Sequence, residues 1–278
     1  MLTSIVFRYH LPSPLVVRPT IANSTLINGL GRYPNGPKSP LSTISVESGK
    51  RYRFRLMSMS CSSYFTFSID GHNMTIIEAD GVNTQPLTVD SIRIYAGQRY
   101  SFVLDANKAG GNYWVRAEPP EGLDGGPTGF EGGINSAILH YAGSLEVDPI
   151  TQTQSIDPLV ESNLHPLENP GAPGQPYVGG ADVLINLDFS VVNRKYYTIN
   201  GVTYQPPSVP TLLQILSGTR KASELLPLGS VYTLPPNKVI EISMPAHGAS
   251  GGPVSMLLHV TAGSTDCCTP SILSISTE

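Results

Sequence analysis

The fold of this protein is indicated by the stretch Lys50-Arg51-Tyr52-Arg53-Phe54-Arg55-Leu56, in which arginines alternate with apolar residues. Successive side chains of a β-strand point to opposite faces of its sheet. The alternation therefore predicts a strand with Tyr52, Phe54 and Leu56 in a core and the three arginines in water.

Further strand patterns follow along the chain. Residues 64–69 place Phe65 and Phe67 on one side, and Asp70-Gly71-His72-Asn73 supplies turn formers before an apolar run at residues 74–77, so a β-hairpin is predicted here. Other candidate strands are residues 87–95, 98–104, 113–117, 136–141, 182–189, 195–200 and 238–244. Residues 210–216 fit a short helix or a buried strand. Several short strands at this spacing predict an all-β sandwich or barrel.

The length of 278 residues is enough for two domains, and 27 glycines with 25 prolines are typical of a turn-rich fold. The strand pattern lapses between residues 146 and 180, where prolines recur, and we interpret this segment as an interdomain linker. It would join a complete domain at residues 1–145 to a second domain at residues 181–278. The second domain has few strands, so we predict that it is truncated.

The charge and hydropathy of the chain exclude some partners. With a net charge of −4 and scattered lysines and arginines, the sequence predicts no nucleic-acid surface. No apolar run approaches the roughly 20 residues of a membrane span, and the N-terminus does not read as a signal peptide. Two N-glycosylation sequons, at Asn23 and at Asn73, would suit a secreted glycoprotein, although the second lies in a strand-like run.

The histidines and cysteines do not form a recognisable metal motif. Three cysteines leave at least one thiol without a partner in the chain. The six histidines are His10, His72, His140, His165, His247 and His259. None of them is spaced as H-x-H or H-x-x-x-H, and isolated histidines are usually ordinary hydrogen-bonded side chains. We therefore predict no metal site from spacing alone.

Two weaker motifs give alternatives. His259 and Met256 with Cys267 or Cys268 offer the ligand types of a blue-copper site, but no histidine or methionine follows the cysteines. Gly248-Ala249-Ser250-Gly251-Gly252 matches the nucleophile-elbow pattern of hydrolases, but no helix-start signal follows it. We therefore predict no catalytic residue in this chain.

Several long runs resemble the second cupredoxin domain of fungal laccases, which are multicopper oxidases. One reads Phe67-Ser68-Ile69-Asp70-Gly71-His72-Asn73-Met74-Thr75-Ile76-Ile77-Glu78, and another reads Gly97-Gln98-Arg99-Tyr100-Ser101-Phe102-Val103-Leu104. The resemblance also runs through residues 24–33, 49–56, 90–92 and 132–139, and it enters the third domain at residues 212–218, 225–227 and 240–243. It implies cupredoxin-like Greek-key domains, one complete and one truncated.

The resemblance implies an extracellular enzyme that takes single electrons from phenols and passes them through copper to dioxygen. The family holds its coppers with H-W-H-G and H-S-H motifs in the first domain and with H-P-x-H-x-H and H-C-H-x-x-x-H motifs in the third. None of these motifs occurs in this sequence. Copper is therefore a cofactor of the family that we expect this chain not to bind.

The resemblance also assigns residues to the phenol pocket and to a domain bridge. Cys61 matches a cysteine that is disulfide-bonded to the first domain, so a free thiol is expected here. Ser62 stands where the family often has an aspartate that takes the phenol proton, and serine cannot act as that base. Pro120 and Glu121 match a pocket loop, and Val191 falls near a pocket position of the third domain.

Three hypotheses remain open at this point. The first is a laccase-derived fragment that is inactive alone. The second is a non-catalytic β-sandwich module, which could self-associate through the apolar face that a first domain would cover. The third is an incomplete gene reading or a splice product.

Overall fold

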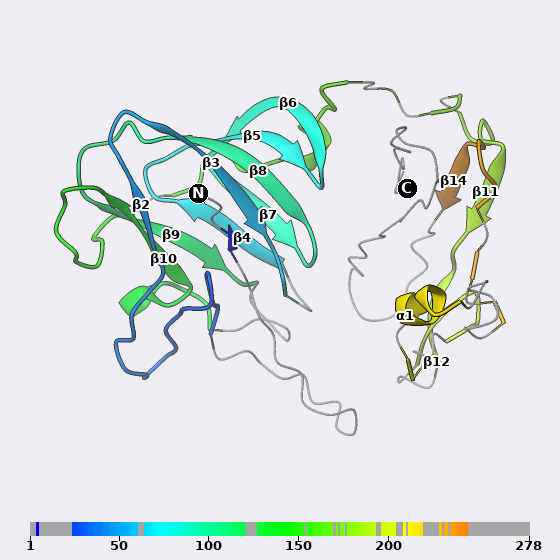
Figure 1. Ribbon diagram of the computed structural model, residues 1–278, viewed down its shortest axis with the longest axis horizontal. Coiled ribbons are helices and arrows are strands. Elements are labelled where there is room, and N and C mark those ends of the chain that lie inside the picture. Colours follow the sequence, from blue (N-terminus) through cyan, green and yellow to red (C-terminus); the bar gives the residue numbers. More distant parts are fainter. Residues whose placement is uncertain are drawn as a thin grey trace. The chain divides into compact units, whose positions relative to one another are not determined.

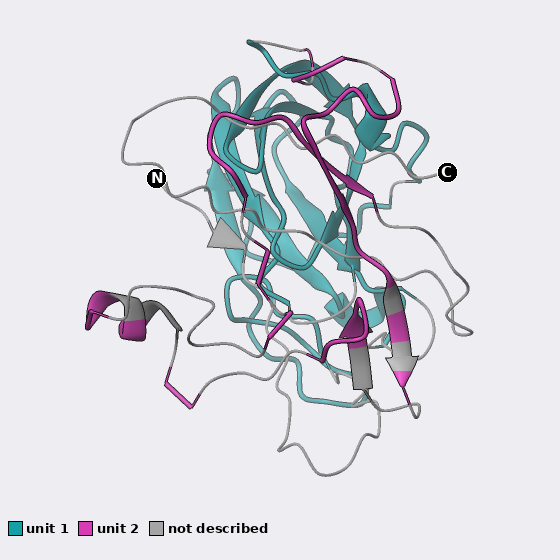
Figure 2. Ribbon diagram, turned by 90° about the vertical axis from the view of Figure 1, so that its right-hand side faces the viewer, with its two compact units in different colours: residues 1–170 teal, residues 171–278 magenta. Residues whose placement is uncertain are grey.

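The structure, a computed structural model, describes residues 4–5, 24–60, 64–120, 127–152, 154–168, 171, 173–175, 177–192, 196–203, 208–209, 211–218, 228–229, 231–232 and 234–243. The chain divides into two compact units, residues 1–170 and 171–278 (Figure 2). The first unit therefore includes most of the segment that we interpret as a linker. None of the helices in the described part of the chain has the length and apolar character of a membrane span.

Unit 1 is built from two five-stranded sheets (Figure 1). The first sheet has the order β1 (Ser4–Ile5), β3 (Arg51–Met57), β8 (Arg99–Asp105), β5 (Met74–Ala79) and β6 (Val82–Val89). The second has the order β2 (Thr43–Val46), β10 (Ser136–Tyr141), β9 (Asn112–Glu118), β4 (Tyr64–Ile69) and β7 (Ser91–Tyr95). Two short 3₁₀ helices, η1 (Glu131–Gly133) and η2 (Glu161–Asn163), complete the unit.

The described part of unit 2 holds two strand pairs and one helix. β11 (Val183–Asn186) runs parallel to β14 (Ile240–Ser243), and β12 (Phe189–Val192) runs antiparallel to β13 (Tyr196–Ile199). The sequence left a short helix or a buried strand open for residues 210–216. The structure has a helix there, α1 (Thr211–Leu216). The predicted truncation of the second domain stays a prediction.

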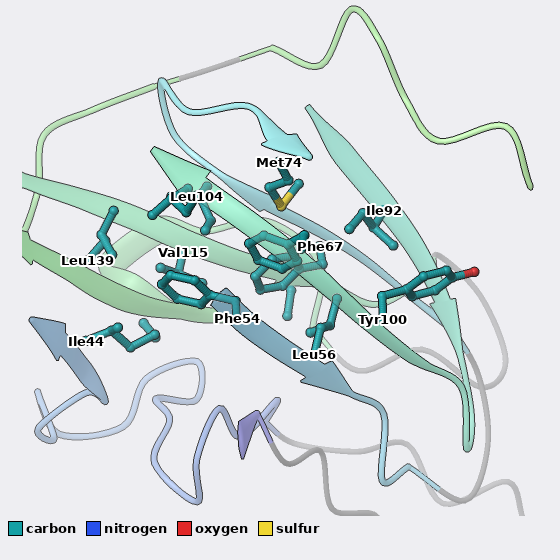
Figure 3. Packing of buried hydrophobic residues seen from close by; sticks show 14 of the residues in the cluster. Ile44, Phe54, Leu56, Phe67, Met74, Ile92, Tyr100, Leu104, Val115 and Leu139 are labelled. Carbon is teal, nitrogen blue, oxygen red and sulfur yellow. The ribbon is translucent and has the colours of Figure 1, made fainter. Parts of the chain in front are cut away.

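A single apolar core fills the space between the two sheets of unit 1 (Figure 3). Leu56 and Phe54 of β3 are buried and Tyr52 is half-buried, whereas Arg51, Arg53 and Arg55 are exposed. Phe102 of β8 stacks on Phe54 at a centroid distance of 5.2 Å. The alternation in residues 50–56 is thus confirmed as a half-buried strand.

The predicted hairpin at residues 64–77 is wrong. β4 pairs with β7 and β9, whereas β5 pairs with β6 and β8 in the other sheet. Residues 70–73 carry the chain across the sandwich instead of folding it back. Asp70 and His72, which a hairpin turn would expose, are buried at this crossing.

The candidate strand at residues 87–95 shows the same behaviour. It is divided at Asp90 into the end of β6 and the whole of β7, and these strands belong to different sheets. The backbone N–H of Asp90 donates to the Asp157 carbonyl oxygen at 3.0 Å rather than to a neighbouring strand. Residues 87–95 look like one strand in the sequence, but the chain changes from the first sheet to the second within them.

A matched pair of leucines tests the placement of the core. Leu104 is fully buried and Leu145 is 80% exposed. Leu104→Ala should lower the free energy of unfolding by about 2–5 kcal/mol, because it leaves a cavity between the sheets. Leu145→Ala should change it by less than about 0.5 kcal/mol. The fluorescence of Trp114, the single tryptophan, follows denaturant unfolding of unit 1. Equal effects of the two substitutions would contradict this core.

Candidate functional site

The structure describes some of the site residues that we expect from the sequence. Cys61, Ser62, Glu121 and Asn23 lie outside the described residues. Pro120 follows β9 and is half-buried, and Val191 lies in β12 of unit 2. The phenol pocket expected from Ser62, Pro120, Glu121 and Val191 therefore stays a prediction. The motifs at residues 247–252 and 256–268 also lie outside the described residues.

Two described histidines of unit 1, His72 and His140, are engaged in hydrogen bonds. His140 Nδ1 lies 2.8 Å from Asn112 Oδ1, and His72 uses both of its ring nitrogens, on Asp70 O at 2.8 Å and Tyr141 Oη at 2.7 Å. Within the described ranges, no three His, Cys, Asp or Glu side chains gather as metal ligands would. A blue-copper site needs thiolate and imidazole ligands on one ion, and the described residues bring no such set together.

His72 is held as a neutral, structural imidazole. The Asp70 carbonyl oxygen can only accept, so His72 Nδ1 carries the proton and Nε2 accepts from the Tyr141 hydroxyl. The Tyr141 oxygen in turn accepts from the Lys108 backbone N–H at 3.3 Å. Burial lowers the pKa of His72, which favours this uncharged form. The ring of Tyr113 meets His72 edge-on at 4.8 Å.

A cavity of about 640 Å³ opens on the second sheet of unit 1. Its walls are Trp114 and Arg116 of β9, residues 130–133 around η1, and residues 148–152. The alternation in β9 places Trp114 and Arg116 on one face of the strand, away from the buried Val115 and Ala117 of the core cluster. The cavity therefore lies on the outer side of β9.

A buried ion pair supports one wall of this cavity. Arg116 Nε donates to Asp70 Oδ1 at 2.8 Å, and Arg116 Nη2 donates to Asp70 Oδ2 at 2.7 Å. The side chains of Arg116 and Asp70 are only 10% and 1% exposed. Thr151 Oγ1 also donates to Asp70 Oδ2 at 2.8 Å, and the guanidinium lies 4.4 Å over the ring of Phe130. The pair thus joins the sheet crossing, β9 and the segment that follows β10.

A second ion pair involves Asp148, which also lines the cavity. Arg32 donates from Nη1 to Asp148 Oδ2 at 2.8 Å and from Nη2 to Asp148 Oδ1 at 3.3 Å, and Lys38 adds a contact at 2.9 Å. The hydrogen bond from Arg32 lowers the pKa of Asp148. Gly133 packs against this arginine with φ +83°, and a Cβ there would lie 2.7 Å from Arg32 Nη1. A side chain at Gly133 would therefore both strain the backbone and displace Arg32.

The chemistry available in the cavity follows from these pairs. Arg116 and Asp148 are each held in an ion pair, so neither is free to act as an acid or a base on a ligand. The remaining walls offer aromatic surface, hydrogen-bonding groups and the carboxylate of Glu131. The sequence contained one signal for this arrangement, because an arginine at position 116 shares a strand face with Trp114. It contained none that joined Arg116 to Asp70, 46 residues away.

Comparison with known proteins assigns the chain to a family. Residues 8–144 match the multicopper oxidase family. Over 255 residues the chain is 60% identical to Laccase-2 of Pleurotus ostreatus, a match that covers 90% of this chain and 46% of that protein. The chain is a homologue of the fungal laccases, in the multicopper oxidase family. Laccase-4 of Trametes villosa is 54% identical, with 93% of this chain and 51% of that protein covered.

The laccase homologue also resembles solved multicopper oxidases in fold. The laccase of Botrytis aclada matches with a TM-score of 0.57 and 25% identity over 72% of this chain and 39% of its own. Fet3p, a multicopper oxidase that functions in iron import, matches with a TM-score of 0.56 and 22% identity over 77% of this chain and 41% of its own. The expected all-β, cupredoxin-like fold is thus confirmed. The chain spans about half the length of the curated relatives that it matches.

The buried ion pair can be tested by a double-mutant cycle. Asp70→Asn and Arg116→Met should each lower the free energy of unfolding by about 3–5 kcal/mol, because each leaves a buried group without its partner. The double variant should be less destabilised than the sum of the two. Trp114 fluorescence reports unfolding beside the pair.

Glu47→Gln provides the matched control. Glu47 and Lys50 form an ion pair in which both side chains are about 60% exposed, and its loss should destabilise the chain far less than either substitution in the buried pair, because water screens exposed charges. Additive effects of the two substitutions at Asp70 and Arg116 would contradict a direct coupling between these residues.

Proposed function

We propose that this chain carries the second domain and part of the third domain of a laccase-type multicopper oxidase, and that the chain by itself binds no copper and oxidises no phenol. The observation that carries the proposal is the identity of 60% to a fungal laccase in a sequence without the family's histidine motifs. The whole enzyme would oxidise phenols one electron at a time and reduce dioxygen to water.

The electron count of dioxygen reduction explains why phenol oxidation would depend on the copper ligands. Reduction of one dioxygen to two waters consumes four electrons, whereas each phenol gives one. A redox centre must therefore collect electrons, and organic side chains do not supply one. The described residues of this laccase homologue offer binding surface and structural ion pairs in its place.

Oxygen uptake tests the proposal. The purified chain, incubated with cupric ion and given catechol, should consume oxygen no faster than the same copper and catechol without protein. Full-length Pleurotus ostreatus laccase serves as the positive control. Uptake that exceeds the copper-only rate and saturates with catechol would contradict the proposal.

We also propose that the laccase homologue is secreted and carries an N-linked glycan at Asn73. Asn73 is exposed and precedes β5, so its side chain stands in the crossing between the sheets rather than inside a strand. A glycan there would extend into solvent.

A secreted preparation tests this glycan. An amidase that removes N-linked glycans should lower the mass of the protein. The same treatment should lower the mass of the Asn73→Gln variant by one glycan less. Identical mass losses in the two proteins would contradict a glycan at Asn73.

The remaining expectations from the family stay predictions. They are the free thiol of Cys61, the phenol pocket around Ser62, and self-association through the face that a first domain would cover. Their residues lie outside the described part of the chain or depend on a partner.

A further inference from the structure

Two strands at the same side of the sandwich end their sheets. β6 is the last strand of the first sheet and β7 is the last strand of the second. Such strands expose backbone N–H and C=O groups that can pair with another chain, and native proteins often cover them with a loop. In this protein the segment of residues 155–167, here called the strap, lies along both strands (Figure 1).

The strap pairs with the backbone of β6. Gln85 N–H donates to the His165 carbonyl oxygen at 2.8 Å, and Leu167 N–H donates to the Asn83 carbonyl oxygen at 2.8 Å. Thr84 and Pro166 form an antiparallel bridge between these two bonds. The strap thus takes up a donor and an acceptor of β6 that another strand could use.

The strap then crosses to β7. Asp90 N–H donates to the Asp157 carbonyl oxygen at 3.0 Å, and Leu159 N–H donates to the Ser91 carbonyl oxygen at 2.8 Å. The side chain of Leu159 packs against the core cluster, as does that of Leu164. The strap therefore closes the side of the sandwich where the chain passes from β6 to β7.

Two carboxylates hold the strap in place. Asp90 accepts from Ser155 Oγ at 2.5 Å, from Ile156 N–H at 2.6 Å and from Asp157 N–H at 2.9 Å. Burial alone would raise the pKa of Asp90, but these hydrogen bonds outweigh it, and its pKa lies below the ordinary value. On the strap itself, Glu161 Oε1 accepts from Tyr100 Oη at 2.7 Å and from Gln98 Nε2 at 2.9 Å.

We propose that the strap guards the edges of β6 and β7, and that loosening it lets β6 pair with β6 of a second copy of this chain. The partner follows from geometry. The strap already pairs with β6 in the antiparallel sense, and two copies of one strand related by a two-fold axis pair in that same sense. The strap, a segment of unit 1, therefore keeps the laccase homologue from assembling through its sheet.

Hydrogen exchange and sedimentation of the full chain test the proposal. In Glu161→Ala the amide hydrogens of Gln85 and Asp90 should exchange about tenfold faster, since bonds to a charged acceptor are lost. The amide of Leu104, in the core, should stay slow. The weight-average mass of the variant should rise with protein concentration more steeply than that of the unsubstituted chain. Over the same range, exchange at Gln85 should slow again as the edges pair.

Two further variants keep the test decisive. Glu146→Ala removes an exposed carboxylate just before the strap and should behave as the unsubstituted chain. Ser155→Ala removes one bond to Asp90 and serves if Glu161→Ala loses the slow exchange of Leu104. Three results would overturn the proposal: unchanged exchange at Gln85, faster exchange without association, or association that leaves Gln85 unprotected at every concentration.

Discussion

The buried ion pair of Arg116 and Asp70 is the interaction on which unit 1 depends most. Desolvation of two charges costs several kcal/mol for each ion, and only good geometry with additional hydrogen bonds offsets it. Here the guanidinium and the carboxylate make two parallel bonds, and Thr151 occupies a further lone pair of the carboxylate. The pair holds the start of the crossing from β4 to β5 against β9, the neighbour of β4 in the second sheet. It also ties residues 148–152 to β9 and thereby shapes the cavity.

The strands of unit 1 could largely be predicted from the sequence, whereas their connections could not. Residues 51–57 and 136–141 show their strand character locally, because period-two alternation depends only on neighbouring residues. Asp70-Gly71-His72-Asn73 suits a hairpin turn equally well, and the residue that pairs with the buried Asp70, Arg116, is distant in sequence. The strap was hidden for the same reason. Its prolines indicated a linker, but its partners Asp90, Gln98 and Tyr100 lie beside or within strands that contain no local sign of the contact.

The candidate site was predictable only in part. The resemblance to laccases supplied the family, but several of the residues that it assigned to the pocket lie outside the described ranges. The cavity beside Trp114 was not foreseen, because its walls come from three separate segments that share no motif. His72 shows why a count of histidines says little about metal binding: its imidazole is fully occupied by the Asp70 carbonyl and the Tyr141 hydroxyl. Family membership and the presence of a working redox centre are therefore separate questions for this chain.

We propose that this laccase homologue has the scaffold of a multicopper oxidase without the ligands for its metal. Native mass spectrometry of the chain is the decisive experiment. The chain would be loaded with copper under reducing and under oxidising conditions, separated from free metal by gel filtration, and sprayed intact. We expect the mass of the metal-free polypeptide, with any copper adducts falling away as the loading concentration is lowered. Retention of copper in a fixed whole-number stoichiometry would contradict it.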